Sequence, residues 1–291
     1  MGFHIVTDSN ADLSIADRKS FSDFSYLHVP YFINDIEGDP NITGHEFFEA
    51  MRNGANTHTA QINPPTFIAL YEELIAEGKR EFLCITLSSK LSGLCESATN
   101  AANLIMKKHP DVTILVVDTI SASIGMGHLV KSAVEARDQG KSLSETRDLL
   151  EARKHRICHW FTVGDLTYLK RSGRLSAGAA WFGMALNIKP VLHIDSSGKL
   201  VPVEKKIGRS KAIQRLIDHY SETALDRGNG IVYVLHADIP EEANSVKTAI
   251  ETQTGSKNVV LTEMGPVIGS HVGPGTLALP KIGRASCRER V

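Results

Sequence analysis

The stretch from Phe82 to Ala98 constrains the fold most, because its pattern changes within a few residues. An apolar run from Phe82 to Leu87 predicts a buried strand, and apolar residues at helical spacing predict a helix that begins near Leu94. Hydroxyl side chains and a Ser-Gly pair separate the two. This order of strand, polar turn and helix is typical of a parallel α/β sheet.

Such a turn carries backbone N–H groups and hydroxyls at the carboxyl end of a strand, where open α/β sheets bind ligands and helix amino termini favour anions. We therefore interpret Ser92 and Gly93 as the centre of an anion-binding site. A plainer interpretation is also open: Ser88, Ser89 and Ser92 only cap the helix.

The same order recurs on both sides of this stretch. His4–Thr7 and Val112–Val117 predict strands, each followed by polar residues and a helix, and Ser25–Ile33 predicts a further strand. Two prolines make Asn56–Thr66 a loop, and Thr59 is its candidate functional residue. We expect residues 1–153 to form an α/β domain with a largely parallel sheet flanked by helices.

The pattern changes after about Lys154. Ile188–Ile194 and Leu200–Lys206 predict strands joined by a short turn, which implies antiparallel pairing. Met264–Leu279, with four glycines and His271, is expected to be a closing loop. Residues 154–281 are thus a predicted α+β domain with a mixed or antiparallel sheet, and we interpret 282–291 as a non-native tail from adjacent vector sequence.

Composition excludes several classes of protein. A net charge of −1 and a sequence pI near 6.9 argue against a nucleic-acid or anionic membrane surface. No apolar run approaches the ~20 residues of a membrane span. The four cysteines form no C-x-x-C pair, which favours a reducing compartment, so we expect a cytoplasmic protein. Basic residues gather at Lys170–Arg174 and Lys205–Lys211, as a solvated face or a partner docking patch.

Taken together, these motifs resemble the DegV family of bacterial fatty-acid-binding proteins over about residues 3–279. The resemblance rests on separate blocks in the order of the family: VTDSNADLS at 6–14, TAQINPPTF at 59–67, ITLSSKLSGLCESA at 85–98, VVDTISASIGMG at 116–127, LTYLKRSGRLS at 166–176, LNIKPVLHIDSSGKL at 186–200 and MGPVIGSHVGPGTL at 264–277.

The resemblance implies a non-catalytic carrier of two α/β domains, with a long-chain fatty acid buried between them and presented to a separate fatty acid kinase that makes the acyl phosphate. No metal or other cofactor is implied. Thr59 and Ser92 match carboxylate contacts of the family, and His271 matches a histidine near the head group. The Gly93 N–H is a further donor.

The basic residues Arg171, Arg174 and Arg209 are candidates for docking the kinase. The sequence departs from the family at Ala60 and Leu94, which replace a motif Ser and Thr, and at Ile207, where an Arg is usual. The apolar tunnel is expected to involve Ala179–Leu186 and the Val259–Ile268 region.

The main alternative is a lipid esterase, because Ser92, Asp118 and His271 follow the Ser, Asp, His order of α/β-hydrolases. No G-x-S-x-G motif surrounds Ser92, however. His155, Cys158 and His159 lie close in sequence without completing a metal ligand set. Neither a dinucleotide fingerprint nor a P-loop lysine is present, so the chain is not expected to be the kinase itself.

Overall fold

The computed structural model describes residues 2–175, 187–226 and 228–283, and these form two compact units. Unit 1 comprises the described parts of residues 1–30 and 60–154, and unit 2 those of residues 31–59 and 155–291. The break after residue 154 lies beside the domain boundary expected from the sequence. Residues 31–59, which we expected in the N-terminal domain, belong instead to unit 2.

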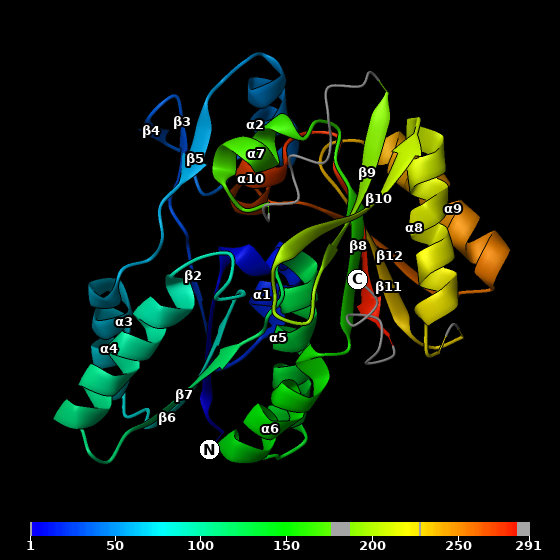
Figure 1. The fold of residues 1–291 in the computed structure, drawn as a ribbon. Coiled ribbons are helices and arrows are strands. Elements are labelled where there is room, and N and C mark those ends of the chain that lie inside the picture. The colour runs from blue at the N-terminus through cyan, green and yellow to red at the C-terminus, as the bar shows by residue number, and fades with distance from the viewer. Residues whose placement is uncertain (1, 176–186, 227, 284–291) are drawn as a thin grey trace. The chain divides into compact units, whose positions relative to one another are not determined.

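Unit 1 is built on a four-stranded sheet in the order β2-β1-β6-β7, and every pair of neighbours is parallel. Helices α3 and α4 lie on one side of the sheet and α5 and α6 on the other (Figure 1). The parallel α/β sheet expected from the sequence is therefore confirmed. Its elements are β1 His4–Asp8, η1 Ser9–Ala11, α1 Ile15–Ser20, β2 Phe24–Leu27, α3 Pro64–Ala76, β6 Glu81–Thr86, α4 Leu94–Lys108, β7 Thr113–Asp118, α5 Ser123–Asp138 and α6 Leu143–Lys154.

Strand order determines where unit 1 can bind a ligand. The chain passes from β1 to β2 on one side of β1 and later returns to β6 on the other side. Loops that leave neighbouring strands in opposite directions open a crevice at the carboxyl edge of a parallel sheet. In unit 1 those loops follow Asp8 and Thr86, so the turn that contains Ser92 lies at the carboxyl edge of this switch point.

Unit 2 contains a six-stranded sheet in the order β10-β9-β8-β13-β11-β12, in which only β11 and β12 pair in parallel. Helices α8 and α9 cover this sheet, and Trp160 lies in the core between the sheet and these helices. The mixed sheet expected from the sequence is confirmed. Its elements are β8 Ile157–Thr162, α7 Thr167–Ser172, β9 Ile188–Ile194, β10 Leu200–Ile207, α8 Arg209–Thr223, β11 Ile231–His236, α9 Pro240–Thr254, β12 Asn258–Glu263, α10 Pro266–Val272 and β13 Leu277–Ile282.

Residues 31–59 add a small sheet and one helix to unit 2. The strands run in the order β4-β3-β5, and helix α10 contacts both β5 and α2. These elements are β3 Tyr31–Ile33, β4 Ile36–Glu37, α2 Gly44–Arg52 and β5 Thr57–Thr59. Helix α2 begins with a capping box, in which Thr43 and Glu46 bond each other's backbone N–H groups.

Two sequence expectations need correction. The strand expected over Ser25–Ile33 is divided into β2 and β3, which belong to different sheets. Pro30 lies at the break, where it has no N–H for a ladder and its carbonyl accepts the N–H of Ala60. The closing loop expected over Met264–Leu279 contains helix α10 and the start of β13, which pairs with β8 and β11.

Ile282, the expected first residue of the non-native tail, is part of the fold. Ile282 pairs with Ile157 in the sheet, and Gly283 bridges to Ala224. Just before them, the buried Lys281 side chain donates to the carbonyl of Tyr220 and the hydroxyl of Thr223, at 2.7 and 2.6 Å. These contacts hold the end of α8, so the fold extends through residue 283.

The rest of the expected tail, 284–291, lies outside the described residues. In the part that the structure describes, no helix combines the length and the apolar character needed to cross a membrane.

Candidate functional site

The turn between β6 and α4 is held closely by backbone hydrogen bonds. Ser88 donates its N–H to the carbonyl of Ser121 at 2.8 Å, and the Ser88 carbonyl accepts the N–H of Leu91 at 3.0 Å. The hydroxyl oxygen of Ser92 then accepts the N–H of Leu94 at 3.2 Å. Because this oxygen accepts from the backbone, the Ser92 hydroxyl can still donate its proton to a ligand.

Gly93 occupies the N-cap of the 15-residue helix α4, which has no side-chain cap. The first N–H groups of such a helix lack helical partners and attract negative charge. A Cβ on Gly93 would lie 2.7 Å from Oε1 of Gln61, so the Gln61 side chain lies against this glycine. Ser92, which is half-buried, and Gly93, which is exposed, thus lie in the polar turn that the sequence predicted, and capping and anion binding remain compatible roles.

Thr59 and His271 meet within unit 2. Thr59 ends β5, His271 lies in α10, and the Thr59 Oγ1 atom is 2.9 Å from Nε2 of His271. Gly269 brings α10 close to α2, because a Cβ there would lie 2.7 Å from the Phe48 ring and 3.1 Å from the Phe47 ring. The structure therefore brings together two of the predicted head-group residues from positions 212 apart.

Burial sets the charge of this pair. Desolvation, with a smaller contribution from the positive charge of Arg174, lowers the pKa of His271 to about 4. The imidazole is therefore neutral near pH 7, with one ring nitrogen as donor and the other as acceptor. The Thr59–His271 pair can offer hydrogen bonds to a carboxylate without a fixed positive charge.

Asp118 has a different role from the one that a hydrolase would require. Its carboxylate accepts the N–H of Ile120 at 2.8 Å and the N–H of Ser89 at 3.3 Å. In a catalytic triad the acid accepts a hydrogen bond from the histidine. Here Asp118 binds backbone N–H groups and His271 binds Thr59, so the geometry does not favour the esterase alternative.

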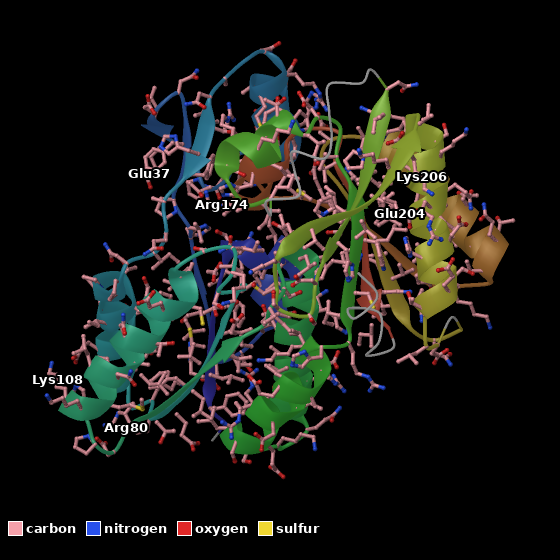
Figure 2. The ribbon with its side chains drawn as sticks, viewed as in Figure 1. Glu37, Arg80, Lys108, Arg174, Glu204 and Lys206 are labelled. Atoms are coloured by element: carbon pink, nitrogen blue, oxygen red, sulfur yellow. The ribbon has the colours of Figure 1, made fainter. Side chains whose placement is uncertain are left out.

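The candidate docking residues Arg171 and Arg174 are exposed at the end of α7. The Arg171 guanidinium lies 5.5 Å from the centre of the Tyr168 ring, and Arg174 donates to the carbonyl of Ser172 at 2.5 Å. Figure 2 shows Arg174 beside α7 and α10, two helices that are in contact. The candidate docking residues thus lie at the end of α7, a helix that contacts α10, which carries the predicted head-group residue His271.

Arg209, the third candidate, is bound within its own unit. Its Nε donates to Oε1 of Glu242 at 3.2 Å, and its Nη2 donates to Oε2 of the same carboxylate at 2.6 Å. Such two-point pairing is the geometry in which Arg binds a carboxylate most strongly. A partner that engages Arg209 must therefore compete with Glu242 or accept the pair as a unit.

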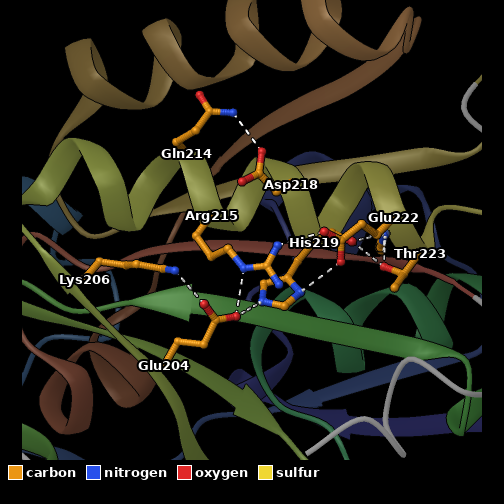
Figure 3. A network of polar contacts seen from close by, with 9 residues as sticks. Glu204, Lys206, Gln214, Arg215, Asp218, His219, Glu222 and Thr223 are labelled. Atoms are coloured by element: carbon orange, nitrogen blue, oxygen red, sulfur yellow. Dashed lines mark hydrogen bonds and ion pairs between the residues drawn. The ribbon is translucent and has the colours of Figure 1, made fainter.

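Much of the remaining basic charge near β10 and α8 is also engaged (Figure 3). Glu204 binds Lys206 at 2.7 Å, Arg215 at 2.8 Å and His219 at 2.9 Å. Burial would raise the pKa of Glu204, but the hydrogen bonds from these three neighbours and the positive charge of Arg215 outweigh it and lower the pKa to about 2. Part of the basic run in the sequence therefore neutralises an internal carboxylate.

Sequence reasoning missed two residues beside these sites. Gln61 lies in the TAQINPPTF block, but nothing in the pattern indicated that it would lie against Gly93. Glu242 lies 33 positions from Arg209 and has no local signal for pairing with it. Two residues at which the sequence departs from the family differ in burial: Leu94 is buried in α4, whereas Ile207 is 69% exposed. The tunnel candidate Ala179–Leu186 lies outside the described residues.

Among the described residues, no group of three or more His, Cys, Asp or Glu side chains is arranged to hold a metal ion. The candidate donors are a hydroxyl and backbone N–H groups in unit 1 and a hydroxyl with a neutral imidazole in unit 2. These groups suit an organic anion that is bound by hydrogen bonds.

Known proteins resemble this chain over nearly its whole length. A family model described as the DegV family of uncharacterised proteins matches residues 2–282. A DegV domain-containing protein of Streptococcus pyogenes serotype M3 is 36% identical over 290 residues, which cover 98% of this chain and 100% of that protein.

Two solved structures share the fold. A fatty acid binding DegV family protein from Streptococcus agalactiae has a TM-score of 0.87 at 25% identity, with 98% of this chain and 99% of that chain covered. A DegV family protein from Thermus thermophilus, described as binding fatty acid, has a TM-score of 0.83 at 30% identity, with 98% and 100% covered.

Proposed function

Because this chain belongs to the DegV family, we propose that it is a non-catalytic carrier that binds a long-chain fatty acid. Solved members of the family are described as fatty-acid-binding proteins. The observation that carries the proposal is the Thr59–His271 hydrogen bond, which places two polar side chains of the predicted head-group set together.

The chemistry of this pair suits a carboxylate. When Nε2 of His271 carries the proton, it donates to Thr59, and the Thr59 hydroxyl then donates to a carboxylate oxygen. A hydrogen bond to a charged acceptor contributes about 1.5–3 kcal/mol. The neutral histidine orients the threonine without forming an ion pair.

In the proposal, Ser92 and Gly93 supply the other donors through the Ser92 hydroxyl and the N–H groups at the start of α4. A single residue, Ala60, joins Thr59 to Gln61, and Gln61 lies against Gly93 within unit 1. The covalent chain thus links the two donor groups by a very short path. One carboxylate can be tested as their shared ligand.

The acyl chain would provide most of the affinity. Burying roughly 14 methylenes at ~0.8 kcal/mol each offers about 10 kcal/mol before ordering costs are subtracted. The polar groups then set the orientation of the ligand. Hydrogen bonds from neutral donors leave a carboxylate oxygen available to accept a phosphoryl group.

The test combines Ser92→Ala with Thr59→Val and measures palmitate binding by titration calorimetry. Each single substitution is expected to weaken binding about 10-fold, because each removes a donor to a charged acceptor. Ser245→Ala with Thr248→Val is the matched control, because these exposed hydroxyls bond only to carbonyls of their own helix, α9.

The control protein should bind palmitate as the unmodified chain does. Unchanged palmitate affinity in the double variant, Ser92→Ala with Thr59→Val, would show that the head group binds elsewhere. Labelling of Ser92 by a fluorophosphonate, detected as a gain in mass, would instead favour the esterase.

The second part of the proposal is presentation of the bound acid to a separate fatty acid kinase. The kinase would transfer the γ-phosphoryl group of ATP to the carboxylate oxygen, which yields acyl phosphate and ADP. Arg171 and Arg174 are the proposed docking residues, because both are exposed, Arg171 in the last turn of α7 and Arg174 just after it, and α7 contacts the helix of His271. Arg209 would contribute together with Glu242.

Reversing the charge with Arg171→Glu and Arg174→Glu should lower the rate of acyl phosphate formation by about 10-fold or more at unchanged palmitate affinity. Arg147→Glu, at a partly exposed arginine of α6, is the control for a charge reversal away from α7 and is compared with Arg171→Glu alone, which changes the charge by the same amount. Equal loss of binding and transfer would contradict a docking role for α7.

A further inference from the structure

We propose that Asp118 is a positioning residue for the Ser88–Gly93 turn and so for the head group of the ligand, an inference that rests on the proposed fatty-acid binding. Asp118 does not belong to the turn. It ends β7, the neighbouring strand of the sheet, and partners Thr86 at the end of β6.

The Asp118 carboxylate joins two loops at the carboxyl edge of the sheet. Both of its oxygens lie 3.3 Å from the N–H nitrogen of Ser89, which is in the turn after β6. One oxygen also accepts the N–H of Ile120, in the loop after β7, at 2.8 Å. A single charged acceptor therefore fixes the start of the turn relative to the next strand.

Further hydrogen bonds support this junction. Ser88 donates its N–H to the Ser121 carbonyl at 2.8 Å, and Thr119 donates its hydroxyl to the Thr86 carbonyl at 2.7 Å. From α6, Lys154 donates to the backbone carbonyl of Asp118 at 3.1 Å. The turn is thus held against a framework of residues 118–121, all of them outside the predicted ligand contacts.

The same loop contains strained backbone. Ile120 has a φ of 46°, a left-handed conformation that is unfavourable for a β-branched residue. Ser123 and Asp12 also have positive φ values, and the Ser123 hydroxyl donates to the Asp12 carboxylate. Strain of this kind persists where the surrounding structure enforces it, often beside a binding site. The Asp118 bond to the Ile120 N–H acts directly on the strained residue.

The role follows from these contacts. If the Ser89 N–H loses its acceptor, the turn can shift, and the Ser92 hydroxyl and the first N–H groups of α4 shift with it. Asp118 acts through the turn and does not touch the ligand. Its effect should therefore depend on the charge of the head group and not on the acyl chain.

The experiment compares palmitate with its methyl ester, which has the same chain without the negative charge. Asp118→Ala should weaken palmitate binding about 10-fold and methyl palmitate binding less than twofold. Asp118→Asn, which keeps one acceptor oxygen, should give an intermediate loss. Asp111→Ala is the control, because Asp111 precedes the opposite end of β7 and is an exposed partner of Arg80.

A double-mutant cycle adds a second readout. In the Ser92→Ala background, Asp118→Ala should cost less than it does in the unmodified protein, because one of the positioned donors, the Ser92 hydroxyl, is already gone. Faster amide hydrogen exchange at Ser89 and Ile120 in Asp118→Ala should accompany the loss of affinity.

Equal losses for palmitate and its ester, or full additivity with Ser92→Ala, would overturn the positioning role and leave Asp118 as a general structural residue. Unchanged palmitate affinity in Asp118→Ala would overturn it as well. Failure of the unmodified chain to bind palmitate is a separate outcome: it would refute the proposed function, and with it the role of Asp118 in binding.

Discussion

The Ser88–Gly93 turn of unit 1 and the Thr59–His271 pair of unit 2 offer hydrogen-bond donors of contrasting kinds. The turn presents a hydroxyl and backbone N–H groups, and contacts between neighbouring strand ends hold it. The pair consists of two side chains from a short strand and a short helix, and one of them can titrate.

This contrast indicates which changes should displace the donors of the turn and which should displace those of the pair. The turn depends on a strong framework, the carboxyl edge of a parallel sheet, and it has no titratable group of its own among its predicted ligand contacts. The pair depends on how closely α10 approaches α2, because that packing places His271. Packing changes and acid should therefore affect the pair more than the turn.

The largest expected effect comes from glycine substitutions that test this difference. Gly269→Ala places a Cβ 2.7 Å from the buried Phe48 ring, so we expect a loss of about 3 kcal/mol in the free energy of unfolding of unit 2. In Gly93→Ala the new Cβ meets only the far end of the exposed Gln61 side chain, which can rotate away. We expect a loss below about 1 kcal/mol there.

Both losses are measured by unfolding in urea, with amide hydrogen exchange followed separately in each unit. A loss in Gly93→Ala as large as that in Gly269→Ala would remove the distinction between a turn held by the edge of the sheet and a pair that depends on helix packing.

Sequence reasoning was most successful where structure is local. The strand Ile188–Ile194 is found with the expected bounds, and the turn at Ser92 lies between a strand and a helix as its change of period predicted. In both places the residues that decide the structure are adjacent in sequence, so propensity and pattern contain the necessary information.

Sequence reasoning failed where contacts between residues far apart in the sequence determine the structure. Residues 264–279 are rich in glycine and proline and were expected to form a loop, yet Leu277–Ile282 is an inner strand because β8 and β11 supply partners on both sides. Gly269 and Gly273 allow close approach to Phe48 and Tyr168, which a local pattern cannot reveal. The resemblance to the family identified His271, but its bond to Thr59 required the fold.

A fall in pH should destabilise the Thr59–His271 pair, with a smaller loss of unfolding free energy than Gly269→Ala causes. His271 has a pKa of about 4 in the fold and 6.5 when exposed, so the unfolded chain binds its proton more tightly. The stability linked to this residue is complete above pH 6.5 and is lost as the pH falls toward 4. At pH 5 the loss is about 2 kcal/mol.

The contribution of His271 is isolated by measuring the free energy of unfolding of the unmodified chain and of His271→Gln at pH 7.5 and pH 5. Other histidines with a lowered pKa, such as His128, contribute equally in both proteins. The unmodified chain should lose about 2 kcal/mol more than the variant. Parallel pH dependence in the two proteins would mean that His271 does not titrate as a buried group.

The smallest expected effect concerns the support of the turn by Gln61. This exposed side chain lies against Gly93 and makes only a long hydrogen bond, 3.3 Å, to the Ser97 hydroxyl. Gln61→Ala should change the free energy of unfolding by less than about 0.5 kcal/mol, as surface substitutions usually do. Palmitate affinity should stay within about twofold, because Asp118 and Ser121 hold the turn from within the sheet. A 10-fold loss in calorimetric titration would instead show that the Gln61 amide is itself a donor to the head group, so that the turn would depend on side chains as the Thr59–His271 pair does.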